Sequence, residues 1–150
     1  MASTNLLSFD YGNKTIGVAV GNTSTGQAHP LTTVRVIRGR VEWDDITKLI
    51  AEWNPVALVV GLPLNMDGSD NPVTPKARKF GNRLNGRYNL PVHMVDERLT
   101  TRDARTQLYN AGVVEKRHKP VLDKLAAQSI LQTYLSEQAE TDIESGIEPV

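Results

Sequence analysis

The stretch that decides the fold is LLSFDYGNKTIGVAVG, which spans residues 6–21. Its first part, residues 6–10, predicts a β-strand, and the glycine, asparagine and lysine that follow are typical of a turn. The chain then returns through residues 15–20, where large apolar residues alternate with the small Gly17 and Ala19. Large side chains on one face of a strand can fill a core, whereas small ones on the other face let a second element approach closely. The stretch therefore predicts an antiparallel hairpin with two different faces.

The rest of the chain changes from strands alone to strands that alternate with helices. The pattern predicts a third strand at 31–37, a helix at 43–53, a buried strand at 56–60 and a loop at 61–71. A helix should follow from Thr74, with Thr74 as its N-cap and Pro75 as its first residue. The last predicted elements are a strand at 91–95 and helices at 100–112 and 121–135. This order predicts an α/β domain with a mixed five-stranded sheet, flanking helices and later strands parallel to the first.

Length and composition point to one globular domain. The chain has 150 residues, 39% of them apolar, and contains no cysteine, which excludes disulfides and thiolate chemistry. No apolar run is long enough to span a membrane, and the first residues lack the layout of a secretory signal, so we expect a cytoplasmic protein without membrane contact. We assign residues 1–136 to the domain and expect 137–150, which hold five acids and no base, to form a disordered acidic tail.

The net charge is zero, but the charges are unevenly distributed. Residues 75–105 hold eight of the 17 Lys and Arg side chains against three acids. A helix that starts at Thr74 places several of these cations along one side, where they indicate either a solvated face or a track for phosphates. The candidate nucleic-acid-binding residues are Lys76, Lys79, Arg83, Arg87, Arg98, Arg102 and Lys119.

Acidic residues fall where strands or helices begin or end. Asp10 ends the first strand, Asp96 and Glu97 end the last strand, and Asp123 lies in the first turn of the last helix. Carboxyl ends of parallel strands meet at one sheet edge, and converging carboxylates require a hard cation such as Mg²⁺ or Mn²⁺. Spacing alone leaves two alternatives open, namely a metal site or ordinary turn-forming and helix-capping acids.

Five motifs in register resemble those of the YqgF/RuvX family, bacterial Holliday-junction resolvases and pre-16S rRNA processing nucleases with an RNase H-like three-layer fold. They are FDYGNKTIGVA at 9–19, VGLPLNMDG at 60–68, the helix at 77–84, DERLTT at 96–101 and LDKLAA at 122–127. The resemblance covers residues 6–135, in the order in which the family carries these motifs.

The resemblance implies a metal-dependent nuclease of the two-metal type that uses Mg²⁺ or Mn²⁺. It places the catalytic and metal-binding carboxylates on Asp10, Glu97 and Asp123, which are positions that the layout had already singled out. Adjacent residues of a strand point to opposite faces, so one of Asp96 and Glu97 should face the site and the other a partner donor. Alternation does not say which, and we expect Glu97, on which the resemblance places the carboxylate, to face the site. The implied substrates are the 5′ region of pre-16S rRNA, in ribosome biogenesis, and branched DNA. A ribosomal precursor and a second copy of the chain are the implied partners.

Two other classes of protein remain open at this stage. The first is a non-catalytic nucleic-acid-binding factor in transcription or ribosome assembly that keeps the fold. The second is an ATP-binding domain of the actin and sugar-kinase type, which also opens with Asp-x-Gly and a hairpin. Such proteins clasp the nucleotide between two domains, and 150 residues hold only one.

Overall fold

The computed structural model describes residues 4–99 and 119–146, and the predicted helix at 100–112 lies outside them. The elements, in chain order, are β1 (Asn5–Asp10), β2 (Thr15–Asn22), β3 (Gln27–Ile37), β4 (Arg40–Val41), α1 (Trp43–Trp53), β5 (Ala57–Leu62), α2 (Thr74–Tyr88), β6 (Val92–Asp96), the 3₁₀ turn η1 (Glu97–Leu99) and α4 (Lys119–Gly146).

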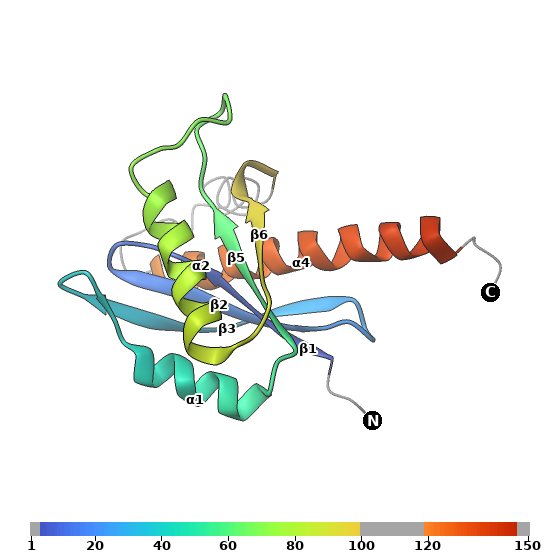
Figure 1. Cartoon of the computed structure of the whole chain (residues 1–150), viewed down its shortest axis with the longest axis horizontal. Helices are drawn as coiled ribbons and strands as arrows, with labels where there is room; N and C mark the ends of the chain where they lie inside the picture. The colour runs from blue at the N-terminus through green and yellow to red at the C-terminus, as the bar shows by residue number, and fades with distance from the viewer. Residues whose placement is uncertain (1–3, 100–118, 147–150) are drawn as a thin grey trace.

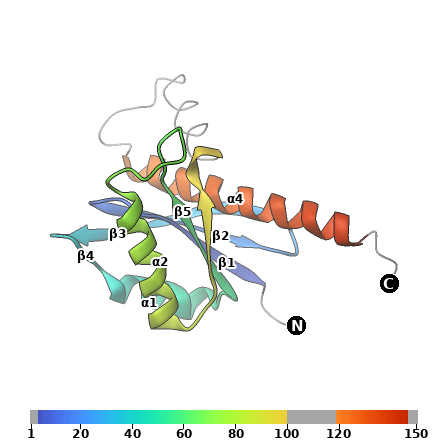
Figure 2. The ribbon, with the colours of Figure 1, turned by 45° about the horizontal axis from the view of Figure 1, so that its top comes forward.

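One mixed sheet lies between two layers of helices, with α1 and α2 on one face and α4 across the other (Figures 1 and 2). The strand order is β4-β3-β2-β1-β5-β6. Strands β1 to β4 pair antiparallel in sequence order, whereas β5 runs parallel to β1 and β6 parallel to β5. The three-layer arrangement and the parallel second half of the sheet confirm the predicted fold class.

The alternation of the first hairpin divides the interior into two cores. Leu7 and Phe9 point toward α1 and α2, where they pack with Phe80 of α2. Leu6 and Ala19 point the other way and pack against Ile130 and other residues of α4. The face toward α1 and α2 carries large side chains, whereas the face toward α4 is built partly from alanine and glycine. The long helix can therefore lie close to the strands.

The sheet has six strands, so the prediction of five was wrong by one short strand. Strand β4 pairs with the end of β3 after a tight turn in which Arg38 and Gly39 adopt left-handed φ values of 53° and 77°. A strand of two residues has no period to detect, and an arginine gives no turn signal. Strand β3 also begins earlier than predicted, because a register irregularity opposite Val18 accommodates Pro30 within the strand.

Two helix ends also differ from expectation. The start of α2 is capped by Asn71, whose Oδ1 accepts hydrogen bonds from the backbone amides of Val73 (2.8 Å) and Thr74 (3.1 Å), rather than by the predicted Thr74. Helix α4 continues to Gly146, well past the predicted end at Leu135. The backbone is therefore helical over much of the expected tail, because good helix formers and no proline occupy those positions.

The close packing of α4 depends on one glycine of β2. A Cβ added at Gly17 would stand 1.9 Å from the backbone carbonyl oxygen of Asp123. Even alanine therefore cannot be placed there unless α4 moves away from the sheet. By contrast, a Cβ added at Gly86, on the exposed side of α2, would meet nothing within 4 Å.

We predict that Gly17→Ala lowers the free energy of unfolding by about 1–3 kcal/mol or more, the usual cost of overpacking a core. Gly86→Ala is the matched control and should raise it by about 0.5–1 kcal/mol, because alanine is the better helix former. Urea denaturation of both variants measures the difference. Equal stability of the two variants would contradict the proposed contact.

Candidate active site

Asp10 ends β1 on the sheet face that α4 covers. It lies directly opposite Gly17 on β2, and directly opposed residues of antiparallel strands point to the same face. Ser8, two residues earlier, confirms this direction because its hydroxyl donates to the backbone oxygen of Ala127 on α4 (2.7 Å). The Asp10 residue is only 6% exposed. The structure therefore holds this carboxylate between the end of β1 and α4.

Asp123 reaches the same region from the first turns of α4. It is 4% exposed, and its Oδ2 accepts a short hydrogen bond from the hydroxyl of Thr15 at the start of β2. The approach is possible because Gly17 has no side chain and because Ala126 and Ala127 are fully buried against the sheet. Two residues of β2 therefore bring the two acids to the same region. Gly17 lies opposite Asp10 and leaves room for α4, and Thr15 donates a hydrogen bond to Asp123.

Glu97 follows β6 and turns its side chain toward α4. A Cβ added at Gly61 of β5 would stand 2.7 Å from Glu97 Oε1 and 2.4 Å from Cδ1 of Ile130, so the glutamate side chain occupies space that only a glycine leaves open. Glu97 Oε1 is shielded from solvent. The carboxylate therefore lies between β5 and α4, at the end of the sheet where β1 also ends.

Asp96 has a different environment, as strand alternation predicts. Both of its oxygens accept hydrogen bonds from Arg98, with 2.6 Å between Arg98 Nη2 and Asp96 Oδ2. These hydrogen bonds from the guanidinium hold the pKa of Asp96 below its ordinary value. Of the two neighbouring acids, Glu97 faces α4, and Asp96 is bound by an arginine.

The sheet face toward α4 holds the carboxylates of Asp10, Glu97 and Asp123, but together these do not form a complete set of metal ligands. Within 4–99 and 119–146, no group of three or more His, Cys, Asp or Glu side chains is placed so that it could hold a metal ion. Carboxylates repel one another unless a cation lies between them, so their separation is the arrangement that electrostatics favours for the protein alone. Oxygen donors of this kind are nevertheless the ligands that Mg²⁺ and Mn²⁺ prefer.

Arg98 also holds the loop that follows β5. Its Nη1 donates to the backbone oxygen of Met66 (3.2 Å), and it lies against Gly68, whose φ is +89°. We predicted a nucleic-acid contact for Arg98, and the structure shows that its charge is already bound to Asp96 and to the loop. The residue joins the end of β6 to the turn of the loop.

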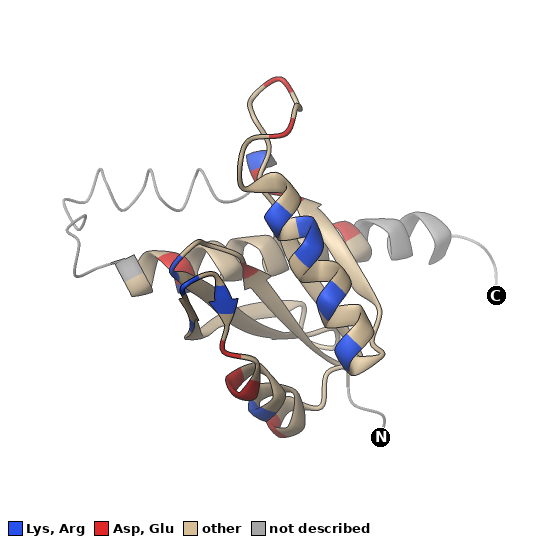
Figure 3. Cartoon of the chain, turned by 60° about the vertical axis from the view of Figure 1, so that its left-hand side comes forward, with Lys and Arg blue, Asp and Glu red and all other residues tan. Residues whose placement is uncertain are grey.

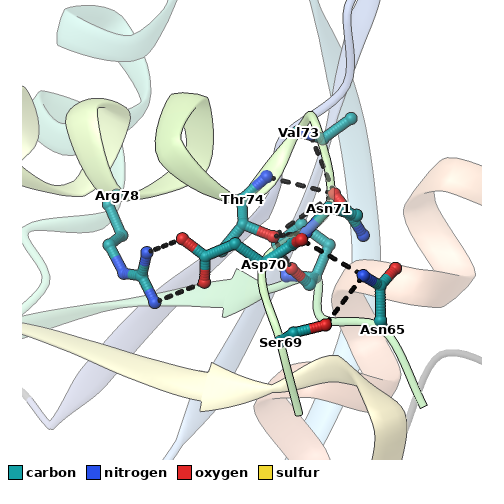
Figure 4. A network of polar contacts seen from close by, with 8 residues as sticks. Asn65, Ser69, Asp70, Asn71, Val73, Thr74 and Arg78 are labelled. Carbon is teal, nitrogen blue, oxygen red and sulfur yellow. Dashed lines mark hydrogen bonds and ion pairs between the residues drawn. The ribbon is translucent and has the colours of Figure 1, made fainter. Parts of the chain in front are cut away.

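The remainder of this loop is joined to α2 by a network of polar contacts (Figure 4). Arg78 makes a two-pronged ion pair with Asp70 (2.6 and 3.1 Å), which lowers the pKa of the carboxyl. Asn65 donates to Ser69 Oγ (3.0 Å) and to the backbone oxygen of Asp70 (3.1 Å). The network fixes the loop beside the start of α2 and uses the Arg78 charge internally.

The predicted basic residues of α2 follow one side of the helix (Figure 3). Lys76, Lys79 and Arg83 line a hollow of about 240 Å³ next to the turn between β1 and β2. The Arg87 guanidinium lies 4.2 Å from the centre of the Trp43 ring, which is a cation–π contact. Arg102 lies outside the described residues, as does the side chain of Lys119.

Sequence reasoning missed two residues beside the carboxylates. Thr15 holds Asp123, and the exposed Arg35 lies opposite Thr15 on β3, on the face toward α4. Neither belongs to a recognisable charge pattern. The pairing register of β2 with β3 is the signal that would have found both, because it brings residues 20 positions apart side by side.

Comparison with solved structures defines the class of protein first. The fold is similar to that of RuvC from T. thermophilus in complex with a Holliday junction substrate, with a TM-score of 0.58, 14% identity, and coverage of 91% of this chain and 97% of that chain. It is also similar to the fowlpox virus Holliday junction resolvase, with a TM-score of 0.54 and 12% identity over 89% of this chain and 99% of that one. The chain has the RNase H-like fold of these resolvases.

Sequence comparison identifies the family. The family model described as "RuvX: Holliday junction resolvase" matches residues 4–137, and the chain belongs to this family. A protein of Aeromonas hydrophila named "Putative pre-16S rRNA nuclease" is 50% identical over 92% of this chain and 99% of its own length. One of Nitrosococcus oceani with the same name is 51% identical over 89% of this chain and 87% of its own. Fold and family together make the chain a nuclease, a hydrolase of phosphodiester bonds.

No helix in the described part of the chain is both long enough and apolar enough to cross a membrane.

We predict that Thr15→Val lowers the free energy of unfolding by about 1.5–3 kcal/mol, because it removes a hydroxyl that donates to a buried carboxylate and keeps the side-chain shape. Thr15→Ser retains the hydroxyl and should lose less than half as much. Chemical denaturation measures both values. A serine variant as unstable as the valine variant would show that the methyl group, rather than the hydrogen bond, is what matters.

Proposed function

We propose that this chain is a divalent-metal-dependent nuclease that cleaves structured RNA, with the 5′ region of pre-16S rRNA as its substrate and the cytoplasm as its location. The observation that carries the proposal is the burial of Asp10 and Asp123 on the face where Glu97 also lies, beside a surface of unpaired cations on α2. Carboxylate oxygens gathered on one face are the donors that Mg²⁺ and Mn²⁺ prefer, and nearby cations can hold the phosphates of a nucleic acid.

The three carboxylates are the proposed ligands of the cation and the proposed catalytic residues. Bound divalent ions would polarise the scissile phosphate and stabilise the attacking and leaving oxygens. Asp10 is placed by the end of β1, Asp123 is oriented by the hydroxyl of Thr15, and Glu97 is confined between Gly61 and Ile130. Each carboxylate thus has a separate structural support on the face toward α4.

The cations of α2 are the proposed contacts to substrate phosphates. Lys76, Lys79 and Arg83 line the same hollow, and within the described residues none of them forms an ion pair.

Two other arginines are already bound by acids. Arg78 pairs with Asp70 and Arg98 with Asp96, and both hold the loop after β5. The nucleic-acid surface therefore consists of the α2 cations that have no acidic partner, together with Arg87 at the far end of the helix. Arg102 and Lys119 remain proposed contacts from the sequence alone.

RNA is favoured over branched DNA by the relatives that share about half of their residues with this chain across nearly its whole length, all of which are named for pre-16S rRNA. Cleavage of a Holliday junction is a second candidate, favoured by the description of the family model. A four-way junction has two-fold symmetry, so that activity would require a homodimer. A cleavage assay with pre-16S rRNA and junction DNA side by side, each with Mg²⁺ or Mn²⁺, distinguishes the two candidates.

We predict that Asp10→Asn abolishes cleavage and leaves the fold intact, because asparagine has nearly the same shape but lacks the charge that a divalent ion needs. Its melting temperature without metal should stay the same or rise, since the change relieves repulsion between carboxylates. Asp44→Asn, an exposed acid of α1, is the control and should cleave normally. Full activity of purified Asp10→Asn would refute the assignment and favour a non-catalytic binding factor.

We predict that Lys79→Ala combined with Arg83→Ala weakens nucleic-acid binding and flattens its salt dependence. The loss of two phosphate contacts should reduce the slope of log K against log salt by roughly 1.4–1.8. Lys48→Ala, an exposed lysine of α1 away from the hollow, should leave the slope unchanged. Binding measured at several salt concentrations in EDTA tests this without cleavage. An unchanged slope in the double variant would show that this face is only solvated.

A further inference from the structure

The hollow beside α2 has walls from three separate parts of the chain. Tyr11 and Asn13 come from the turn between β1 and β2, Gly39 and Val41 come from the turn and strand after β3, and the remaining wall is α2. Lys76 Nζ donates to Asn13 Oδ1 (3.3 Å), which joins the helix to the first turn. A Cβ added at Gly39 would meet nothing within 4 Å, so the hairpin side stays open.

The lining of the hollow combines aromatic rings with positive charge. The half-buried Tyr11 ring lies 5.4 Å, between ring centres, from that of Phe80, and the Trp43 ring also stacks on Phe80 at 5.7 Å. Phe80 is 2% exposed, so Tyr11 is the ring that a ligand in the hollow can contact. The cations of Lys76, Lys79 and Arg83 stand along the α2 wall.

Tyr11 also connects the hollow to the carboxylates. It directly follows Asp10, and adjacent residues at a strand end point to opposite faces of the sheet. Asp10 faces α4, whereas Tyr11 packs on Phe80 of α2. The hollow and the candidate cleavage site therefore meet at the same end of β1, on opposite faces of the sheet.

A basic groove with an aromatic platform is the combination that binds single-stranded nucleic acid, because every base has a face that can stack and every nucleotide has a phosphate. The volume of about 240 Å³ is below the ~300–1,000 Å³ of typical small-molecule pockets, which suits a single nucleotide rather than a longer segment of the strand. A paired base within a duplex cannot present its face to Tyr11, because its neighbours in the stack cover it.

We propose that this hollow holds one unpaired nucleotide of the substrate next to the scissile phosphate, with its base stacked on Tyr11 and its phosphate bound by Lys76, Lys79 and Arg83. The inference rests on the proposed nuclease function and specifies its substrate class, which is a strand unpaired at the cleavage site. The hollow selects for an accessible base face and not for base identity, since stacking on a ring tolerates every base.

The test is a binding measurement in EDTA, where no divalent ion is available and cleavage does not interfere. Two RNA duplexes of the same sequence are compared, one fully paired and one with a single unpaired 2-aminopurine whose fluorescence reports stacking. The wild-type protein should bind the second duplex more tightly and quench its fluorescence. Tyr11→Leu should abolish the quenching and weaken binding to the unpaired duplex by roughly 5-fold or more, with little change for the paired one.

Two further variants separate stacking from a loss of structure. Tyr11→Phe keeps the ring and should retain both the preference and the quenching. Tyr134→Leu removes a half-buried ring from α4, where it stacks on His93 (5.1 Å between ring centres), and should also leave both unchanged. Melting temperatures establish that all variants are folded.

The outcomes separate this inference from the proposed function. Equal weakening of Tyr11→Leu on both duplexes, or wild-type binding without preference or quenching, would overturn the unpaired-nucleotide site even if the enzyme cleaves RNA. A clear preference that depends on Tyr11 supports the site even if neither Mg²⁺ nor Mn²⁺ allows cleavage, and in that case only the nuclease proposal fails.

Discussion

The contact between the backbones of β2 and α4 at Gly17 and Asp123 is the constraint on which the site depends. Helix α4 lies across the sheet at a distance that a side chain on Gly17 would not permit. That distance brings Asp123 within reach of Thr15 and buries it on the face where Asp10 ends β1. A second glycine, Gly61, makes the equivalent space for Glu97. The carboxylates are therefore placed by the absence of side chains at two positions of the sheet, one on each of the strands that flank β1.

The division of the sheet into two faces separates two kinds of chemistry. The face toward α4 holds the acids, while the side toward α2 holds the ring of Tyr11 and cations that form no ion pair with any residue in 4–99 or 119–146. Asp10 and Tyr11 are adjacent in the chain and lie on either side of this boundary. A substrate that follows the end of the sheet would pass from a region of positive charge, which attracts phosphates, to a region of negative charge, where the proposed divalent cation would accept them.

The ion pairs determine which cations are available to a partner. In the sequence, Arg78 and Arg98 look as available to a phosphate as Lys79 and Arg83, because all four are basic residues of the same segment, 75–105. In the structure, the first two are bound by Asp70 and Asp96 and stabilise the loop after β5, whereas the latter two line the hollow. The number of basic residues in a segment is thus a poor guide to the charge that it offers a partner, because a carboxylate at hydrogen-bond distance offsets the charge of the arginine that it binds.

The sequence by itself determined the elements, their order and the face that each strand residue occupies, since these follow from local periodicity and from alternation along a strand. That Asp96 and Glu97 point to opposite faces followed from that alternation, while the choice of Glu97 as the one that faces the site followed from the resemblance to the family. The two-residue strand β4, the cap by Asn71 and the role of Thr15 did not, because each depends on a pairing register or a hydrogen bond between residues without a local pattern. Tertiary structure alone decided how the carboxylates are held and which cations, in the part of the chain that the structure describes, have an acidic partner. Both depend on contacts between segments distant in the chain, such as Arg98 with the carbonyl of Met66 or Gly17 with Asp123, and no local pattern in the sequence records them.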